Sequence, residues 1–155
     1  MLSNSLSSKE ELLDERKVFG DQLAVLLSDN QLFISKVQKA QWNYQVLSDE
    51  QYNAVINLLF NCSELIANQL RIQIGHVPAN FSVFLEMSNL NEVLDEGSGF
   101  EARKDVIESH NILLEFVMQF VNDRFDVFAD ERSSITSELH QQHTKIYKLI
   151  ESLNK

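Results

Sequence analysis

Hydrophobic residues recur every three or four positions along most of the chain, the spacing that places side chains on one face of an α-helix. Ser8-Lys9-Glu10-Glu11 has the form of a capping box, which marks a helix start. We therefore predict one helix from about Ser8 to about Tyr44, with residues 1–7 as a short flexible tail. Its apolar row includes a polar residue, Asn30, which we expect to set the helix register. The row is Phe19, Leu23, Leu26, Asn30, Phe33, Val37, Ala40 and Tyr44.

A second capping box, Ser48-Asp49-Glu50-Gln51, predicts a helix from Asp49 to about Ile74, ended by Gly75 with Pro78 beyond it. Most of its circumference is apolar. One narrow polar stripe occupies a sector of roughly 80° at about 100° per residue. This stripe faces solvent, or else a subunit interface or interior cavity. It consists of Asn53, Asn57, Asn61, Glu64, Asn68 and Arg71.

The segment from Gly75 to Ala102 is too long for a turn and predicts a connection that crosses the molecule, with a short helix around 81–87. The helical pattern returns at Arg103 and predicts a third helix that ends near Phe128. After residues 129–134, a last helix is predicted from Ile135 almost to the carboxyl end. Four helices with one long connection between the second and third correspond to the ferritin-like four-helix bundle. We predict a single all-α domain over residues 1–155.

The amino-acid composition limits the classes of fold and function that this chain can have. Four glycines and one proline in 155 residues leave little turn chemistry for a many-stranded sheet. A net charge of -10 disfavours a phosphate-binding surface, and residues 1–15 hold Lys9 against four acids. The single Cys62 excludes a disulfide within the chain. No apolar run reaches the ~18 residues of a membrane span, and the start has no export signal, so a cytoplasmic protein without membrane association is expected.

Three segments carry a family resemblance. The first predicted helix ends Gln41-Trp42-Asn43, the second ends with the segment 64–75, and the crossover holds Pro78 followed by Phe84-Leu85-Glu86-Met87-Ser88. Together they resemble the Dps family, the mini-ferritins that store iron and protect DNA in bacteria. The resemblance extends from about Leu23 to Leu153. It implies a hollow homo-oligomer, a dodecamer in that family, with ferroxidase centres between two-fold-related subunits.

The resemblance also implies a set of iron ligands, most of them changed in type. The family's first histidine corresponds to Gln41, and its late aspartate and glutamate correspond to Glu64 and Asn68. Because the chain before Ala67 is about one turn shorter than usual, the ligands early in the second helix correspond either to Asn53 and Asn57 or to Asp49 and Asn53. Iron takes oxygen and nitrogen donors, but an amide oxygen is neutral and weaker than a carboxylate. The candidate iron site is Gln41, Asp49, Asn53, Glu64 and Asn68.

Two other groups have metal-binding residue types. His140 and His143 are three positions apart, a spacing that allows a shared metal, although His143 also falls beside an apolar row. Acidic residues surround the last connection: Asp123, Asp126, Asp130 and Glu131, with Glu138 further on. In the Dps family, acids in this region line the three-fold pores through which iron enters. The alternative is a solvated acidic turn.

Three functional hypotheses follow. The hypothesis that the sequence favours is a mini-ferritin that binds, oxidises and stores iron and protects the cell from oxidative stress, with a weakened or rearranged ferroxidase site. The second is a non-catalytic oligomer with a structural or partner-binding role, in which the amide stripe is the interface. The third, a protein that coats DNA, is the least expected because of the charge.

Overall fold

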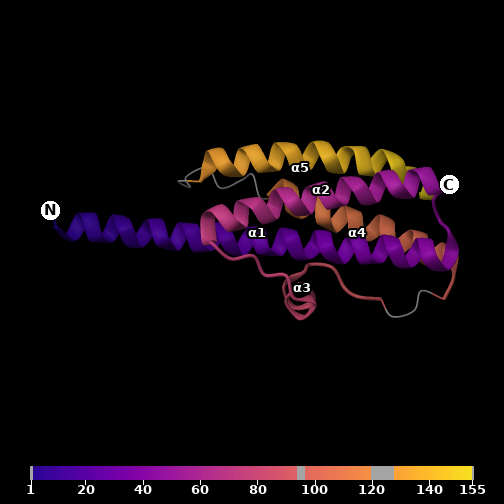
Figure 1. The fold of residues 1–155 in the computed structure, drawn as a ribbon, viewed down its shortest axis with the longest axis horizontal. Helices are drawn as coiled ribbons and strands as arrows, with labels where there is room; N and C mark the ends of the chain where they lie inside the picture. Colours follow the sequence, from indigo (N-terminus) through magenta and orange to yellow (C-terminus); the bar gives the residue numbers. More distant parts are fainter. Residues whose placement is uncertain (1, 94–96, 120–127, 155) are drawn as a thin grey trace.

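The computed structural model describes residues 2–93, 97–119 and 128–154, and over these residues it is helical with no strand (Figure 1). The five α-helices are α1 (Leu2–Tyr44), α2 (Asp49–Ile74), α3 (Phe81–Met87), α4 (Gly99–Gln119) and α5 (Ala129–Ile150). A 3-10 helix, Glu151–Asn154, follows α5. The all-α prediction is therefore confirmed.

The four long helices pack side by side. Helix α1 contacts α2 and α4, and α5 contacts the same two helices. Figure 1 shows that α1 and α5 run in one direction while α2 and α4 run in the other. After α2, the chain carries α3 along the flank of α1 and reaches the opposite end before α4 begins. The predicted long connection with a short helix is thus confirmed.

The core lies where the apolar rows meet, and the predicted row of α1 forms its centre. Phe19, Leu23 and Phe33 are fully buried. The other helices contribute Val55, Leu59, Ile66, Leu70, Val106, Leu113, Val117, Ile135, Leu139, Ile146 and Ile150. Asn30 sits within this core, where its Nδ2 donates to the Leu59 carbonyl at 2.8 Å and to Ser63 Oγ at 2.6 Å. Asn30 therefore joins α1 to α2, and its role in setting the helix register stays a prediction.

Both ends of α2 follow the predicted local chemistry. Ser48 Oγ accepts from the Gln51 amide at 3.1 Å, and Gln51 Oε1 accepts from the Ser48 amide at 3.2 Å. At the other end Gly75 has φ 79, a left-handed conformation that glycine adopts without steric cost, and its N–H donates to the Arg71 carbonyl. The predicted bounds 49–74 are confirmed.

Three predicted helix starts were wrong. Helix α1 begins at Leu2, so residues 2–7 are helical and the capping sequence at Ser8 lies inside the helix. Helix α4 begins at Gly99 rather than Arg103, because Ser98 Oγ accepts from the Glu101 amide at 3.2 Å. Helix α5 begins at Ala129, so residues 129–134 are helix and not connection. The predicted end of the third helix falls on residues 120–127, outside the described residues.

The amino-terminal part of α1 projects beyond the other helices (Figure 1). We call residues 2–18 the arm. From Lys9 to Val18 every side chain is exposed except the half-buried Glu15. Burial of α1 begins at Phe19, where the bundle starts. Among the described residues, no helix has both the length and the apolar character needed to cross a membrane.

Candidate functional site

The predicted ligand Gln41 is buried at the connection between α1 and α2, with 6 % of its surface exposed. Its Nε2 donates to the Leu47 carbonyl at 2.9 Å, and its Oε1 accepts from the Leu47 amide at 3.0 Å. Both ends of the side-chain amide therefore bind backbone within the same chain. This residue closes the short connection between the two helices.

The other four predicted ligands, Asp49, Asn53, Glu64 and Asn68, are all exposed on α2. Asp49 and Glu64 are fifteen residues apart, which at 1.5 Å per residue separates them by about 22 Å along the helix. One chain alone does not bring the five candidates together. Within the described ranges, no group of three or more His, Cys, Asp or Glu is placed to hold a metal ion.

The predicted polar stripe of α2 faces outward. The exposed side chains of α2 between positions 53 and 72, which include this stripe, are mostly uncharged: Asn53, Asn57, Phe60, Asn61, Glu64, Asn68, Arg71 and Ile72. At the end of α1, Trp42 is 72 % exposed and lines a shallow hollow with Asp49 and Tyr52. The exposed side of α4 has more charge, with Glu101, Lys104, Glu108 and Glu115, although it also exposes Phe100, Asn111, Ile112, Met118 and Gln119. We call the α2 residues together with Trp42 the amide face.

The acidic residues predicted near the last connection are only partly described. Asp123 and Asp126 lie outside the described residues. Asp130 and Glu131 occupy the first turn of α5, where negative charge stabilises the positive end of the helix dipole. Glu138 lies further along α5 and shares a hollow of about 250 Å³ with Asn68 of α2. The pore role stays a prediction.

His140 and His143 do not form the metal pair that their spacing allowed. His140 is exposed, whereas His143 is buried and its Nδ1 lies 3.2 Å from Nε2 of His110 on α4. Burial lowers the pKa of His110 to about 4. Burial, together with the charges of His110 and His140, lowers the pKa of His143 to about 3. Both rings are therefore neutral at pH 7 and share one hydrogen bond. The sequence placed each histidine on an apolar face but gave no sign that they pair.

A second buried contact that sequence reasoning missed is centred on Asp29 of α1. Its Oδ1 accepts from Ser88 Oγ at 2.7 Å and from the Asn89 amide at 2.6 Å, and its Oδ2 accepts from Asn89 Nδ2 at 2.9 Å. Burial raises the pKa of Asp29, and these hydrogen bonds oppose the shift. The carboxylate fixes the end of α3 against α1.

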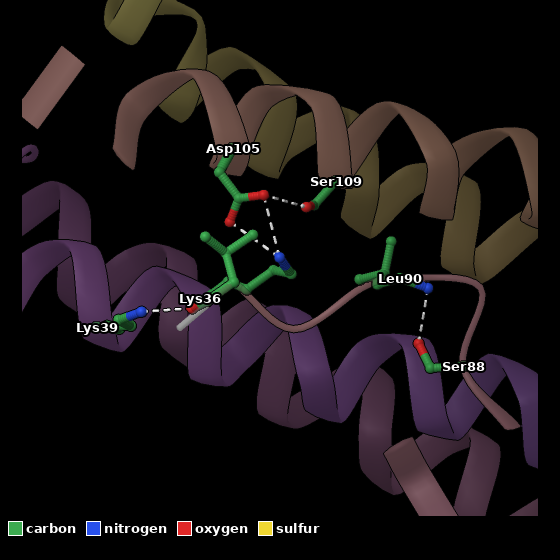
Figure 2. A network of polar contacts seen from close by, with 7 residues as sticks. Lys36, Lys39, Ser88, Leu90, Asp105 and Ser109 are labelled. Carbon is green, nitrogen blue, oxygen red and sulfur yellow. Dashed lines mark hydrogen bonds and ion pairs between the residues drawn. The ribbon is translucent and has the colours of Figure 1, made fainter. Parts of the chain in front are cut away.

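A third contact joins α1 to α4, as Figure 2 shows. Lys36 Nζ lies 3.0 and 2.9 Å from the two carboxylate oxygens of Asp105, and Ser109 Oγ donates to the same carboxylate at 3.4 Å. The Lys36 and Asp105 side chains are 7 % and 19 % exposed. The sequence held one signal for this contact, which is the charge of Lys36 within the apolar stretch of α1. A buried charge requires a partner of opposite charge.

Comparison with known proteins gave no match to a family model, a curated protein or a solved structure.

Proposed function

We propose that this protein is a non-catalytic homo-oligomer of helical bundles, and that the amide face is its subunit interface. The observation that carries the proposal is the scarcity of charge on that face in a chain of net charge -10. Interface cores are depleted in Glu, Asp and Lys and enriched in aromatic residues. Trp42 and Phe60, which are 72 % and 48 % exposed, supply such aromatic surface.

The arrangement of the helices supports a ferritin-like bundle within this proposal. Two antiparallel pairs joined by a crossover along the bundle are the arrangement of that class. With the resemblance to the Dps family, it favours a closed assembly such as a dodecamer. Closed homo-oligomers commonly use two-fold contacts in which one patch meets its own copy. Phe60 and Asn61 stand near the middle of α2, where such an axis would pass.

The test is the mass of the assembly in solution. Changing Asn57 and Asn61 to lysine places four like charges across a two-fold contact, and we expect the complex to dissociate to a smaller species. Analytical ultracentrifugation of the full chain measures this. Asn111→Lys is the matched control, because Asn111 is an exposed asparagine on α4. A monomeric wild type, or equal masses for the double variant and the control, would contradict the proposal.

Iron oxidation is the second candidate, and the position of Glu64 favours it. Glu64 is exposed in the middle of the amide face, one turn from Asn61 and from Asn68. A two-fold contact across this face would bring the carboxylate and amide oxygens of a second copy to the same place. Oxygen donors from two copies suit hard ferrous and ferric ions. In this scheme iron is the substrate, and the assembled interface completes the site.

Metal-free protein loaded anaerobically with ferrous iron and then mixed with hydrogen peroxide tests this candidate. We expect ferric absorbance to form faster than in a protein-free control, and the gain to be lost in Glu64→Ala. Glu115→Ala, which removes an exposed glutamate from α4, should oxidise iron like the wild type. A rate equal to that of the protein-free control would contradict iron oxidation and leave the structural role as the one remaining candidate. Residues 1–15, with Lys9 against Glu10, Glu11, Asp14 and Glu15, add no support for DNA binding.

A further inference from the structure

Helix α2 carries four charged residues, Asp49, Glu50, Glu64 and Arg71, and all four are exposed. Two of the acids lie in the first turn of the helix, and the arginine lies in its last turn. Arg71 Nη2 donates to Asn68 Oδ1 at 3.4 Å, which is longer than an ordinary N–H···O hydrogen bond. Within the described residues, no carboxylate forms a salt bridge with Arg71. The helix therefore has a cation without a counter-ion at one end and two carboxylates at the other.

The acidic end of α2 borders an aromatic hollow. This hollow has a volume of about 600 Å³, and its lining includes Trp42, Asp49 and Tyr52. Trp42 is 72 % exposed, so most of its indole surface is uncovered in the single chain. An arginine guanidinium binds the face of a tryptophan or tyrosine ring, and a carboxylate beside the ring binds its N–H groups. The hollow therefore has the chemistry of a site for an arginine side chain.

We propose that Arg71 of a second copy occupies this hollow, in an antiparallel pair of α2 helices whose two-fold axis passes between Phe60 and Asn61. This inference rests on the proposed function of the amide face as the subunit interface, and it specifies the register and the charge pairs of that interface. Arg71 and Glu50 lie equally far from this axis along α2, so each Arg71 comes opposite Glu50 of the other copy. The hollow adjoins this position through Asp49. The two-fold symmetry forms the contact twice.

The same register gives the other polar positions of the face suitable partners. Asn53 lies opposite Asn68 of the second copy, and Asn57 lies opposite Glu64. A side-chain amide has both donors and acceptors, so it pairs with another amide or donates to a carboxylate. Glu138 of α5, which shares a hollow with Asn68, adds an acceptor beside Asn53 of the second copy. Each of these polar groups therefore has a hydrogen-bonding partner across the contact.

Other arrangements of the two helices bring like charges together. With the two-fold axis at Asn57, Glu64 would lie opposite Glu50 of the second copy. With the axis at Glu64, that carboxylate would lie against its own copy. A parallel pair would place every charged residue of α2 against itself. Among these arrangements, the axis in the middle of α2 is the one in which Arg71 meets an acid.

Charge exchange tests the pair between Arg71 and Glu50. Arg71→Glu and Glu50→Lys should each raise the concentration at which the assembly half dissociates by roughly tenfold, because two pairs per contact change from attraction to repulsion. The variant with both changes should recover most of the lost affinity. Lys104→Glu and Glu101→Lys on α4 are the matched controls, since Lys104 is exposed and Glu101 also occupies a first helical turn. Analytical ultracentrifugation of the full chain over a dilution series measures each variant.

Trp42 is the single tryptophan of the chain, so its fluorescence reports on the hollow directly. Assembly should shift its emission to shorter wavelength and slow its quenching by acrylamide, because Arg71 of the second copy covers the indole. Arg71→Ala, measured at a concentration where ultracentrifugation finds it assembled, should be quenched faster than the wild type. Lys104→Ala should be quenched like the wild type.

Cysteine cross-linking measures the register without changing a charge. Asn53→Cys and Asn68→Cys each place the new thiol about 22 Å from its own copy along the helices, so each variant alone should stay uncross-linked on a non-reducing gel. The two variants should cross-link under mild oxidation when they are co-expressed, because position 53 lies opposite position 68. The native Cys62 is buried and serves as the background.

The outcomes separate this register from the interface on which it rests. A monomeric wild type would overturn both proposals. An assembly that dissociates in Asn57→Lys, Asn61→Lys but is unaffected by Arg71→Glu would overturn the register and retain the interface. The same conclusion would follow if the charge exchange failed to restore association, or if Asn53→Cys cross-linked with itself.

Discussion

At the scale of single residues, three polar side chains on one stretch of α1 join it to three different elements. Asp29 binds the end of α3, Asn30 binds α2, and Lys36 binds Asp105 of α4. Each contact is buried and specific in geometry, whereas apolar packing tolerates sliding of one helix past another. Residues 29–36 therefore determine how the neighbours of α1 are positioned.

The ion pair between Lys36 and Asp105 permits a direct prediction. Lys36→Ala leaves a poorly solvated carboxylate without its cation, so we expect the free energy of unfolding to fall by about 3 kcal/mol. Urea denaturation at neutral pH measures this. Lys104→Ala is the control, because Lys104 and Glu108 are both exposed and 3.9 Å apart, and its loss should cost less than about 1 kcal/mol. Equal losses in the two variants would show that burial of the pair has no energetic effect.

At the scale of elements, α4 and α5 meet across the hydrogen-bonded rings of His110 and His143. The ring of Phe33 from α1 also packs on His110, with centroids 5.3 Å apart. Charging either ring would place an unsolvated cation in the core. This contact therefore makes the packing of two helices sensitive to acid.

The sign of the pH dependence follows from the pKa values. In the folded state the pKa is about 4 for His110 and about 3 for His143, both below the ordinary 6.5. Between each of these values and pH 6.5, the unfolded chain therefore binds more protons than the folded chain. Their contribution to stability is complete above pH 6.5 and is lost as the pH falls below it, by up to about 1.4 kcal/mol per pH unit for each histidine. We expect the urea concentration at the midpoint of unfolding to decrease as the pH is lowered from 7 to 5.

The double variant His110→Leu, His143→Leu should lose most of that slope, because leucine does not titrate. His76→Leu removes an exposed histidine just after α2, away from the pair, and should keep the wild-type slope. An unchanged pH dependence in the double variant would assign the acid sensitivity to other groups. Asp29 acts in the opposite direction, since its raised pKa favours proton uptake by the folded state.

Helix boundaries were predictable where local chemistry defines them. Ser48, Gln51 and Gly75 satisfy the ends of α2 from within a few residues, and both ends were predicted correctly. The capping sequence at Ser8 has the same letters as a true cap, but nothing before it stops the helix, which continues to Leu2. A cap sequence thus permits a helix start without requiring one.

At the scale of the whole molecule, the amide face carries fewer charged residues than the exposed side of α4. This face lies along α2, and Trp42 adds exposed aromatic surface at the end of α1. A two-fold contact through this face would join one subunit to a second copy within the proposed closed assembly.

The sequence by itself determined the helical class, the crossover, the core row of α1 and the outward stripe of α2. These depend on periodicity and on short-range capping, which the order of residues contains directly. The pairing of His110 with His143 and of Lys36 with Asp105, and the use of Gln41 to close a turn, were decided by tertiary structure. Each depends on which helices become neighbours and at what rotation, and a one-dimensional pattern does not specify that geometry.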